Sequence, residues 1–242
     1  MTPDHKAMEP VPDDWERALA IVAHPDDMEY GAAGAVAHWT SRGKRLTYLL
    51  VTRGETGIDA LDPDECARIR EAEERAAAAI VGVDTVEFLD HPDGLIEYGL
   101  PLRADLALAI RRHRPEVIVT LNHRETWGGG RLNMADHRHV GLAALDAARD
   151  AANPSLFRAP DAPDAPDAWS GTRYALIAGS SDPTHFVDVS EDLERAIASL
   201  EAHARYLEHV GTDARELLTS IAEQVGQASG VRYATSFELV SL

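Results

Sequence analysis

Cysteine and lysine are scarce in this chain. Cys66 is the only cysteine, which excludes an internal disulfide and a zinc site built from several cysteines, so we interpret it as a small packing residue. Only Lys6 and Lys44 among the 23 basic residues are lysines, and 41 acidic residues bring the net charge to −18. Because the chain has no basic stripe to displace counterions from phosphates, we expect it to bind neither nucleic acid nor an anionic membrane.

Long apolar runs are also missing. None approaches 18 residues, and residues 1–16 lack the basic end and apolar segment of a signal peptide, so we expect no membrane insertion and a cytoplasmic location. The 242 residues, 45% apolar, predict a single domain over 1–242 and are compatible with a homo-oligomer. We expect 1–16 to be a polar tail and the Asp-Ala-Pro repetition at 159–169 to be an exposed loop.

Short apolar segments alternate with longer segments of helical periodicity. The predicted strands are 20–23, 45–52, 86–89, 116–121, 174–178, 185–189 and 232–240. The predicted helices are 31–40, 64–81, 100–112, 135–151, 193–207 and 213–224. This alternation predicts an α/β fold, with a mostly parallel twisted sheet covered by helices on both faces.

Glycine is missing where a dinucleotide site would need it. Such sites place glycines in the turn after the first strand, so that pyrophosphate can approach backbone amides. Here Asp26, Asp27 and Glu29 occupy this turn, and Gly31 and Gly34 come later. Three carboxylates would repel phosphate, so dinucleotide binding is disfavoured.

The turn after the first strand has metal-binding chemistry instead. His24 and Asp27 are three residues apart across Pro25, whose fixed φ favours a tight turn. Imidazole and carboxylate are good zinc ligands, which leaves Asp26 free to act as a base. The competing interpretation is that Asp26 or Asp27 only caps the next helix.

His137 is the best candidate for a third ligand. It begins a helix after the strand 116–121, which should adjoin the first strand at the point where strand order reverses. A lone histidine at a helix start is also typical of a capping or surface residue. The predicted meeting of both segments at one sheet edge favours a ligand.

Two motifs resemble those of a known family. Residues 23–27 read Ala-His-Pro-Asp-Asp and are followed by Glu29 and Gly31, while 136–141 read Asp-His-Arg-His-Val-Gly. The chain thereby resembles the PIG-L/LmbE-type zinc-dependent de-N-acetylases over about 18–210. Weaker agreement is found at 52–55, Arg70, Glu73, 93–94, 187–189 and His203.

The resemblance implies a Rossmann-like fold and a set of residue roles. It makes His24, Asp27 and His137 the metal ligands, Asp26 the general base and Arg70 a substrate-binding residue. Members of this family hydrolyse N-acetyl groups of acetylglucosaminyl phosphatidylinositol, of the acetylglucosaminyl-inositol precursor of mycothiol, and related amides.

Met134 departs from the family pattern. Many members have a histidine at this position that stabilises the tetrahedral oxyanion, and a methionine cannot donate a hydrogen bond. We therefore expect a rebuilt pocket in which another side chain donates. His139 is the least suited candidate, because two residues along a helix turn it away from His137. The expected substrate-binding residues are Arg70, Asp93, His123, Asn133 and His185.

The expected function is therefore removal of an N-acyl group, most simply N-acetyl, from an amino sugar or similar polar small molecule. Zinc is the expected cofactor, and another divalent metal would also suit these ligands. Alternatives are an amidase acting on a thiol conjugate or acylated natural product, a catalytically lapsed metal- or ligand-binding protein, and, less favoured, a non-haem iron enzyme. Specificity should lie in the loops 53–63, 90–99 and 122–134.

Overall fold

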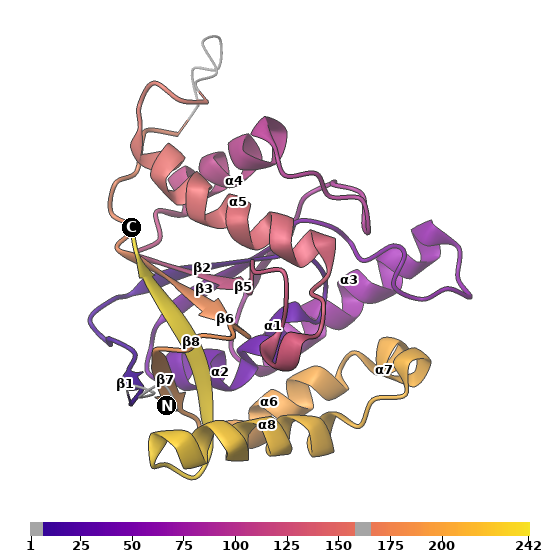
Figure 1. Cartoon of the computed structure of the whole chain (residues 1–242). Helices are drawn as coiled ribbons and strands as arrows, with labels where there is room; N and C mark the ends of the chain where they lie inside the picture. The colour runs from indigo at the N-terminus through magenta and orange to yellow at the C-terminus, as the bar shows by residue number, and fades with distance from the viewer. Residues whose placement is uncertain (1–6, 158–165) are drawn as a thin grey trace.

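The computed structural model describes residues 7–157 and 166–242, in which one eight-stranded sheet lies between two layers of helices (Figure 1). The strands are β1 (Glu9–Pro10), β2 (Arg17–Val22), β3 (Arg45–Leu50), β4 (Thr85–Phe88), β5 (Val117–Leu121), β6 (Tyr174–Ala178), β7 (His185–Asp188) and β8 (Ala234–Ser241). The helices are α1 (Asp27–Gly31), α2 (Ala33–Ser41), α3 (Pro63–Ile80), α4 (Leu100–His113), α5 (Ala135–Ala152), α6 (Leu193–Glu201), α7 (Ala204–Val210) and α8 (Ala214–Ser229). The predicted α/β class is confirmed.

In the sheet, β2 lies between β5 and β3. Along the sheet the order is β1-β7-β8-β6-β5-β2-β3-β4, and only β8 runs antiparallel to its neighbours among the described strands. The chain runs outward from β2 through β3 and β4, then crosses back to β5 on the other side of β2. Strand order therefore reverses between β2 and β5, where a crevice opens at the carboxyl ends of the strands.

The apolar residues of β2 alternate between two cores. Ala18, Ala20 and Val22 belong to the core covered by α2, α6 and α8, whereas Leu19 and Ile21 belong to the core covered by α4 and α5 (Figure 1). All five are buried, because a central parallel strand has helices on both faces. This double burial holds the end of β2, and the turn that follows it, in a fixed place.

Two predicted helices are interrupted. The helix expected over 31–40 begins earlier, at Asp27, and is divided into α1 and α2 at Ala32, whose φ of −149° is not helical. The helix expected over 193–207 is divided into α6 and α7 near His203, which is fully buried. The apolar spacing of this segment did not predict the break. At the break the polar side chain of His203 lies in the interior, where the spacing gives no reason to expect it.

The predicted tail and loop are partly incorporated in the fold. Residues 1–6 and 159–165 lie outside the described residues, but Glu9 and Pro10 pair with β7, and Trp15 is 1% exposed. Trp169 donates from Nε1 to the Pro115 carbonyl (2.7 Å) and packs against the α4–α5 core. Among the described helices, none has both the length and the apolar character needed to cross a membrane.

We predict that Trp15→Ala destabilises the protein by about 3–5 kcal/mol, because it opens a large cavity where the indole meets Trp39 edge-on (centroids 5.3 Å apart). The free energy of unfolding in urea measures this loss. Leu100→Ala, at a side chain 65% exposed, is the control and should change stability by less than about 0.5 kcal/mol. Equal effects of the two substitutions would show that the segment before β2 is not part of the folded core.

Candidate metal centre and active site

The turn after β2 folds the Asp27 carboxylate back onto the end of the strand. Asp27 Oδ2 accepts hydrogen bonds from the backbone N–H groups of Ala23 (3.0 Å) and His24 (2.8 Å). Asp26 lies at the helix N-cap with a φ of 92°, and its side chain caps nothing there. The predicted capping role is therefore not observed. The positive φ is a strained conformation of a kind that concentrates at functional sites.

His24, Asp27 and His137 meet in one buried group. His24 Nδ1 lies 3.3 Å from His137 Nε2, and His137 Nε2 lies 3.1 Å from Asp27 Oδ1. The distance from His24 Nδ1 to Asp27 Oδ2 is 3.7 Å. Three donors bound to one ion at zinc distances with tetrahedral angles lie about 3.4 Å apart. The three side chains therefore fit a single divalent metal ion.

The other nitrogen of His24 faces two carboxylates. Nε2 lies 3.1 Å from Asp93 Oδ1 and 3.2 Å from Asp136 Oδ2. Burial alone would lower the pKa of His24, but hydrogen bonds to Asp136 and Asp93 raise it to about 10. A metal-ligating histidine commonly donates its second N–H to a carboxylate, which orients the ring. This arrangement directs Nδ1 toward Asp27 and His137.

Asp93 and Asp136 are themselves held by backbone amides. Asp136 accepts from the N–H groups of Gly94 (2.8 Å) and Ile96 (3.2 Å), and Asp93 accepts from the N–H and the hydroxyl of Thr56 (2.8 Å each). With His24 they form a second set of candidate metal donors. Their existing hydrogen bonds instead suit them to orienting His24. Asp93, expected to contact substrate, thus lies beside His24, a candidate metal ligand.

Asn133 orients His137. Its Oδ1 lies 3.2 Å from His137 Nδ1, and its Nδ2 donates to the carbonyls of Asn122 (2.7 Å) and Arg124 (3.1 Å). Both amide protons are therefore used inside the protein. The structure places Asn133 near the site, but it contacts the candidate ligand His137 and has no free amide proton for substrate.

Two side chains of helix α3 contact Asp26 and the residue before it. Arg70 Nη2 lies 3.0 Å from Asp26 Oδ2 and also donates to the Pro25 carbonyl, while Glu74 accepts from the Asp26 N–H (3.0 Å). Tyr206 covers the Arg70 guanidinium, 4.0 Å from its ring centroid. Burial raises the pKa of Asp26, and the charge of Arg70 opposes this. Arg70, expected to bind substrate, is 3% exposed and positions Asp26 instead.

A buried ionisable cluster beside Asp26 was not expected from the sequence. His203 Nε2 lies 3.6 Å from carboxylate oxygens of both Glu29 and Glu74, and all three side chains are essentially inaccessible to solvent. They form a third candidate donor set. Burial raises the pKa of Glu29 to about 8. The sequence signal that could have revealed the cluster is Glu74. This charged residue lies one turn after Arg70 and one turn before Ala77 and Ala78, on the helix side that is buried.

The remaining expected residues lie outside this group. His185 is in β7, and three strands separate β7 from β2, which corresponds to about 19 Å at the usual strand spacing. His123 is half-buried beneath Gly141 and does not line the pocket. The ring of His139 is turned to the Ile96 carbonyl (2.6 Å), in agreement with the expectation that it is unsuited. Met134 is 53% exposed and lines the pocket.

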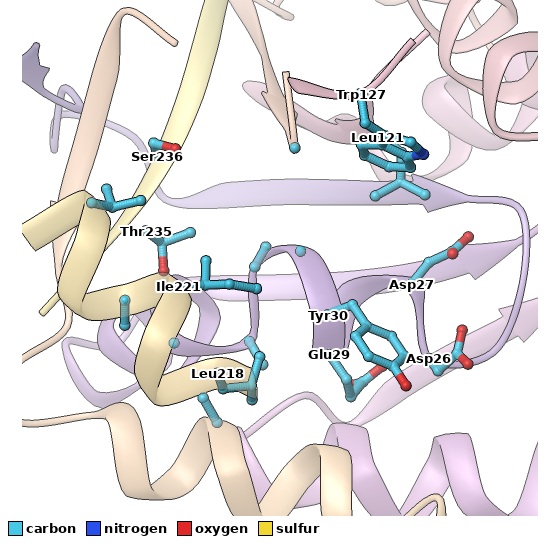
Figure 2. Close-up of a pocket in the computed structure, with 18 of the residues that line it drawn as sticks. Asp26, Asp27, Glu29, Tyr30, Leu121, Trp127, Leu218, Ile221, Thr235 and Ser236 are labelled. Atoms are coloured by element: carbon cyan, nitrogen blue, oxygen red, sulfur yellow. The ribbon is translucent and has the colours of Figure 1, made fainter. Parts of the chain in front are cut away.

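A pocket of about 500 Å³ opens over the site. Asp26, Asp27 and His137 line it at one end, and Figure 2 shows both carboxylates on the side opposite Leu218. The side chains that line it and can donate a hydrogen bond to a ligand include Tyr30, Trp127, Arg131 and Tyr206, in addition to His137.

Together, the fold and the site define an α/β protein with a histidine and carboxylate donor set at the carboxyl edge of its sheet. The chain belongs to the PIG-L family: the family model, described as GlcNAc-PI de-N-acetylase, matches residues 19–148. The resemblance read from the two motifs is thereby confirmed.

Characterised relatives extend the match beyond that range. The diacetylchitobiose deacetylase of Thermococcus kodakarensis is 30% identical over 240 residues, covering 98% of this chain and 87% of its own length. The 1D-myo-inositol 2-acetamido-2-deoxy-alpha-D-glucopyranoside deacetylase of Mycobacterium sp. (strain KMS) is 27% identical, covering 78% of this chain and 73% of its own.

Solved structures share the fold. The N,N'-diacetylchitobiose deacetylase of Pyrococcus horikoshii superposes with a TM-score of 0.83 at 24% identity, covering 94% of this chain and 84% of that one. The 4-carboxy-2-hydroxymuconate hydratase of Pseudomonas putida KT2440 superposes with a TM-score of 0.72 at 21% identity, covering 93% and 96%. The same fold therefore supports both deacetylases and a hydratase, and the site must decide the chemistry.

We predict that Asn133→Ala weakens metal binding about 10- to 100-fold, because His137 loses the partner that sets its ring orientation. Competition with a chromogenic chelator measures the affinity. Asn153→Ala, at the exposed end of α5, is the control and should leave it unchanged. Unaltered affinity in Asn133→Ala would contradict the orienting role.

Proposed function

We propose that this protein is a zinc-dependent hydrolase that removes the N-acetyl group from an amino sugar or a similar polar small molecule. The observation that carries the proposal is the meeting of His24, Asp27 and His137 in one donor set with Asp26 at its side. The deacetylases among the relatives support the same reaction. We further propose that the chain acts as one domain, since a single sheet carries the whole site.

His24, Asp27 and His137 are the proposed metal ligands. Two imidazoles and a carboxylate are a donor set typical of catalytic zinc, which supplies Lewis acidity when it is bound. Cys66 belongs to none of the candidate donor groups among the described residues, and its thiol faces the Gly54 carbonyl (3.3 Å). Asp93, Asp136 and Asn133 hold the two imidazoles in orientation.

Asp26 is the proposed general base. It lines the pocket beside the ligands, and its carboxylate is held by Arg70 at 3.0 Å. Burial raises the pKa of Asp26 above its ordinary value, which makes the carboxylate a stronger proton acceptor. In the proposed reaction Asp26 takes the proton of the attacking water and passes it to the leaving amine.

The hydrogen bond to the acyl oxygen needs a donor other than Met134. Asn133 uses both of its amide protons internally, and His185 lies in a distant strand. The pocket-lining donors Tyr30, Trp127, Arg131 and Tyr206 replace them as candidates. Positioned donors of this kind stabilise developing negative charge in acyl transfer.

Thiol conjugates and acylated natural products remain the alternative substrates of the same hydrolysis. A lapsed, ligand-binding protein is disfavoured by Asp26, because a site that only binds metal has no need of an extra carboxylate carried on a strained backbone. Release of acetate from acetylated amino sugars by the zinc-loaded protein is the direct test. Binding without release from any acetylated amine would overturn the proposed hydrolysis.

We predict that Asp26→Asn keeps the metal but lowers kcat about 10²–10⁴-fold, because the amide cannot accept the proton. Zinc content by elemental analysis and the rate of acetate release are measured together. Asp84→Asn, at an exposed residue before β4, is the matched control. An unchanged rate would remove Asp26 from the mechanism, and loss of zinc would make it a ligand.

We predict that His137→Ala abolishes stoichiometric zinc binding, because His24 and Asp27 alone leave the ion with two protein ligands. The same result is expected for His24→Ala. Dialysis against a buffered zinc concentration, followed by metal analysis, gives the stoichiometry. Full zinc retention in His137→Ala would exclude this residue from the metal site.

A further inference from the structure

The pocket extends well beyond the catalytic group, into an apolar region between α1, α6 and α8. In Figure 2 the pocket runs from Asp26 and Asp27 toward Leu218, Ile221 and Thr235. We name this far part the apolar arm. Its lining residues are Val189, Leu193, Ala196, Leu218, Ile221, Ala222, Val225, Ala234, Thr235 and Ser236.

Small residues form a further wall of the pocket beside the apolar arm. Gly31, Ala32, Ala33 and Gly34 follow one another along the wall formed by α1 and α2, and Ala196 faces the pocket from α6. A Cβ on Gly34 would lie 3.2 Å from Val189 Cγ1, so this segment is already packed closely against the residues after β7. The volume is therefore a consequence of the sequence of the wall, and larger side chains would fill it.

Some of the apolar side chains that line the pocket, including one from the apolar arm, are exposed to solvent. Leu132, Met134 and Ile221 are 70%, 53% and 44% exposed, and all three line the pocket. Exposed apolar side chains around a concave site are typical of surfaces that bind apolar ligands. Met134, which departs from the family pattern, is thus one of several exposed apolar side chains that line the pocket.

We infer that the substrate carries an uncharged apolar substituent, alkyl or aryl, beside its acetamido group, and that the apolar arm binds this substituent. The inference rests on the proposed function. The occupant of the arm is the substrate itself, because the arm and the catalytic group line one pocket. The residues that line the arm have no charged side chain, so a charged substituent would lose its hydration there without a partner.

The test compares the methyl, butyl and octyl β-glycosides of N-acetylglucosamine, each below its micelle concentration, with zinc-loaded protein. The kcat/KM for acetate release should rise with chain length through a lower KM, by up to about fourfold for each methylene that leaves water. Cleavage of all three glycosides at equal kcat/KM would overturn the inference and leave the proposed function intact.

Binding is measured separately from turnover, by calorimetry of the octyl and methyl glycosides with the zinc-loaded Asp26→Asn protein. Tighter binding of the octyl compound supports the inference even where no acetate is released, a result that would count against the proposed function alone. Equal binding of the two glycosides overturns the inference.

Two substitutions locate the effect. Ile221→Asp should lower the octyl-to-methyl ratio of kcat/KM at least about tenfold, because it places a charge on the wall of the apolar arm. Ala222→Leu should also lower this ratio, because the larger side chain fills the arm. Leu100→Asp, at an exposed leucine outside the pocket, is the matched control and should keep the ratio. A ratio unchanged by both pocket variants would overturn the assignment.

Sedimentation of wild type and Ile221→Asp identifies the competing occupant, a second copy of this chain. If Ile221→Asp dissociates an oligomer and the wild type does not favour the octyl glycoside, the apolar arm is a subunit contact and the inference is wrong.

Discussion

The candidate site depends on the polar contacts between α3 and the turn after β2. Arg70 and Glu74 lie one helical turn apart, and together they hold the Pro25 carbonyl, the Asp26 carboxylate and the Asp26 N–H. These contacts stabilise the left-handed backbone conformation of Asp26, which local sterics disfavour. Because Asp27 begins α1 directly afterwards, the same contacts set where its carboxylate meets His24 and His137.

Holding the turn in this way brings several charges into the interior. Arg70, Glu74, Asp26 and Glu29 are each no more than 5% exposed, and breaking a buried ion pair typically costs about 3–5 kcal/mol. His203 closes the cluster from the break between α6 and α7. Apolar packing would stabilise this region at least as well, so the arrangement is best explained by a need to position Asp26.

The two ends of the pocket differ in the chemistry of the residues that line them. At one end, Asp93, Asp136 and Asn133 contact the rings of His24 and His137, and Arg70 contacts the carboxylate of Asp26. At the other end, small residues and the apolar face of α8 leave open space. Because the hydratase of Pseudomonas putida shares the fold, these local differences, and not the architecture, distinguish one reaction from another.

The sequence by itself determined the α/β class, most strand positions and the adjacency of β2 and β5. It also identified His24, Asp27 and His137 as the residues of one candidate donor set. These features follow from local patterns, namely apolar runs, periodicity and motifs at strand ends. Only the tertiary structure decided that Arg70 and Asn133 act on protein groups, that His185 lies elsewhere, and that Glu29, Glu74 and His203 meet. Segments far apart in the chain bring these residues together, and side-chain direction within a helix or loop depends on packing that no local pattern encodes.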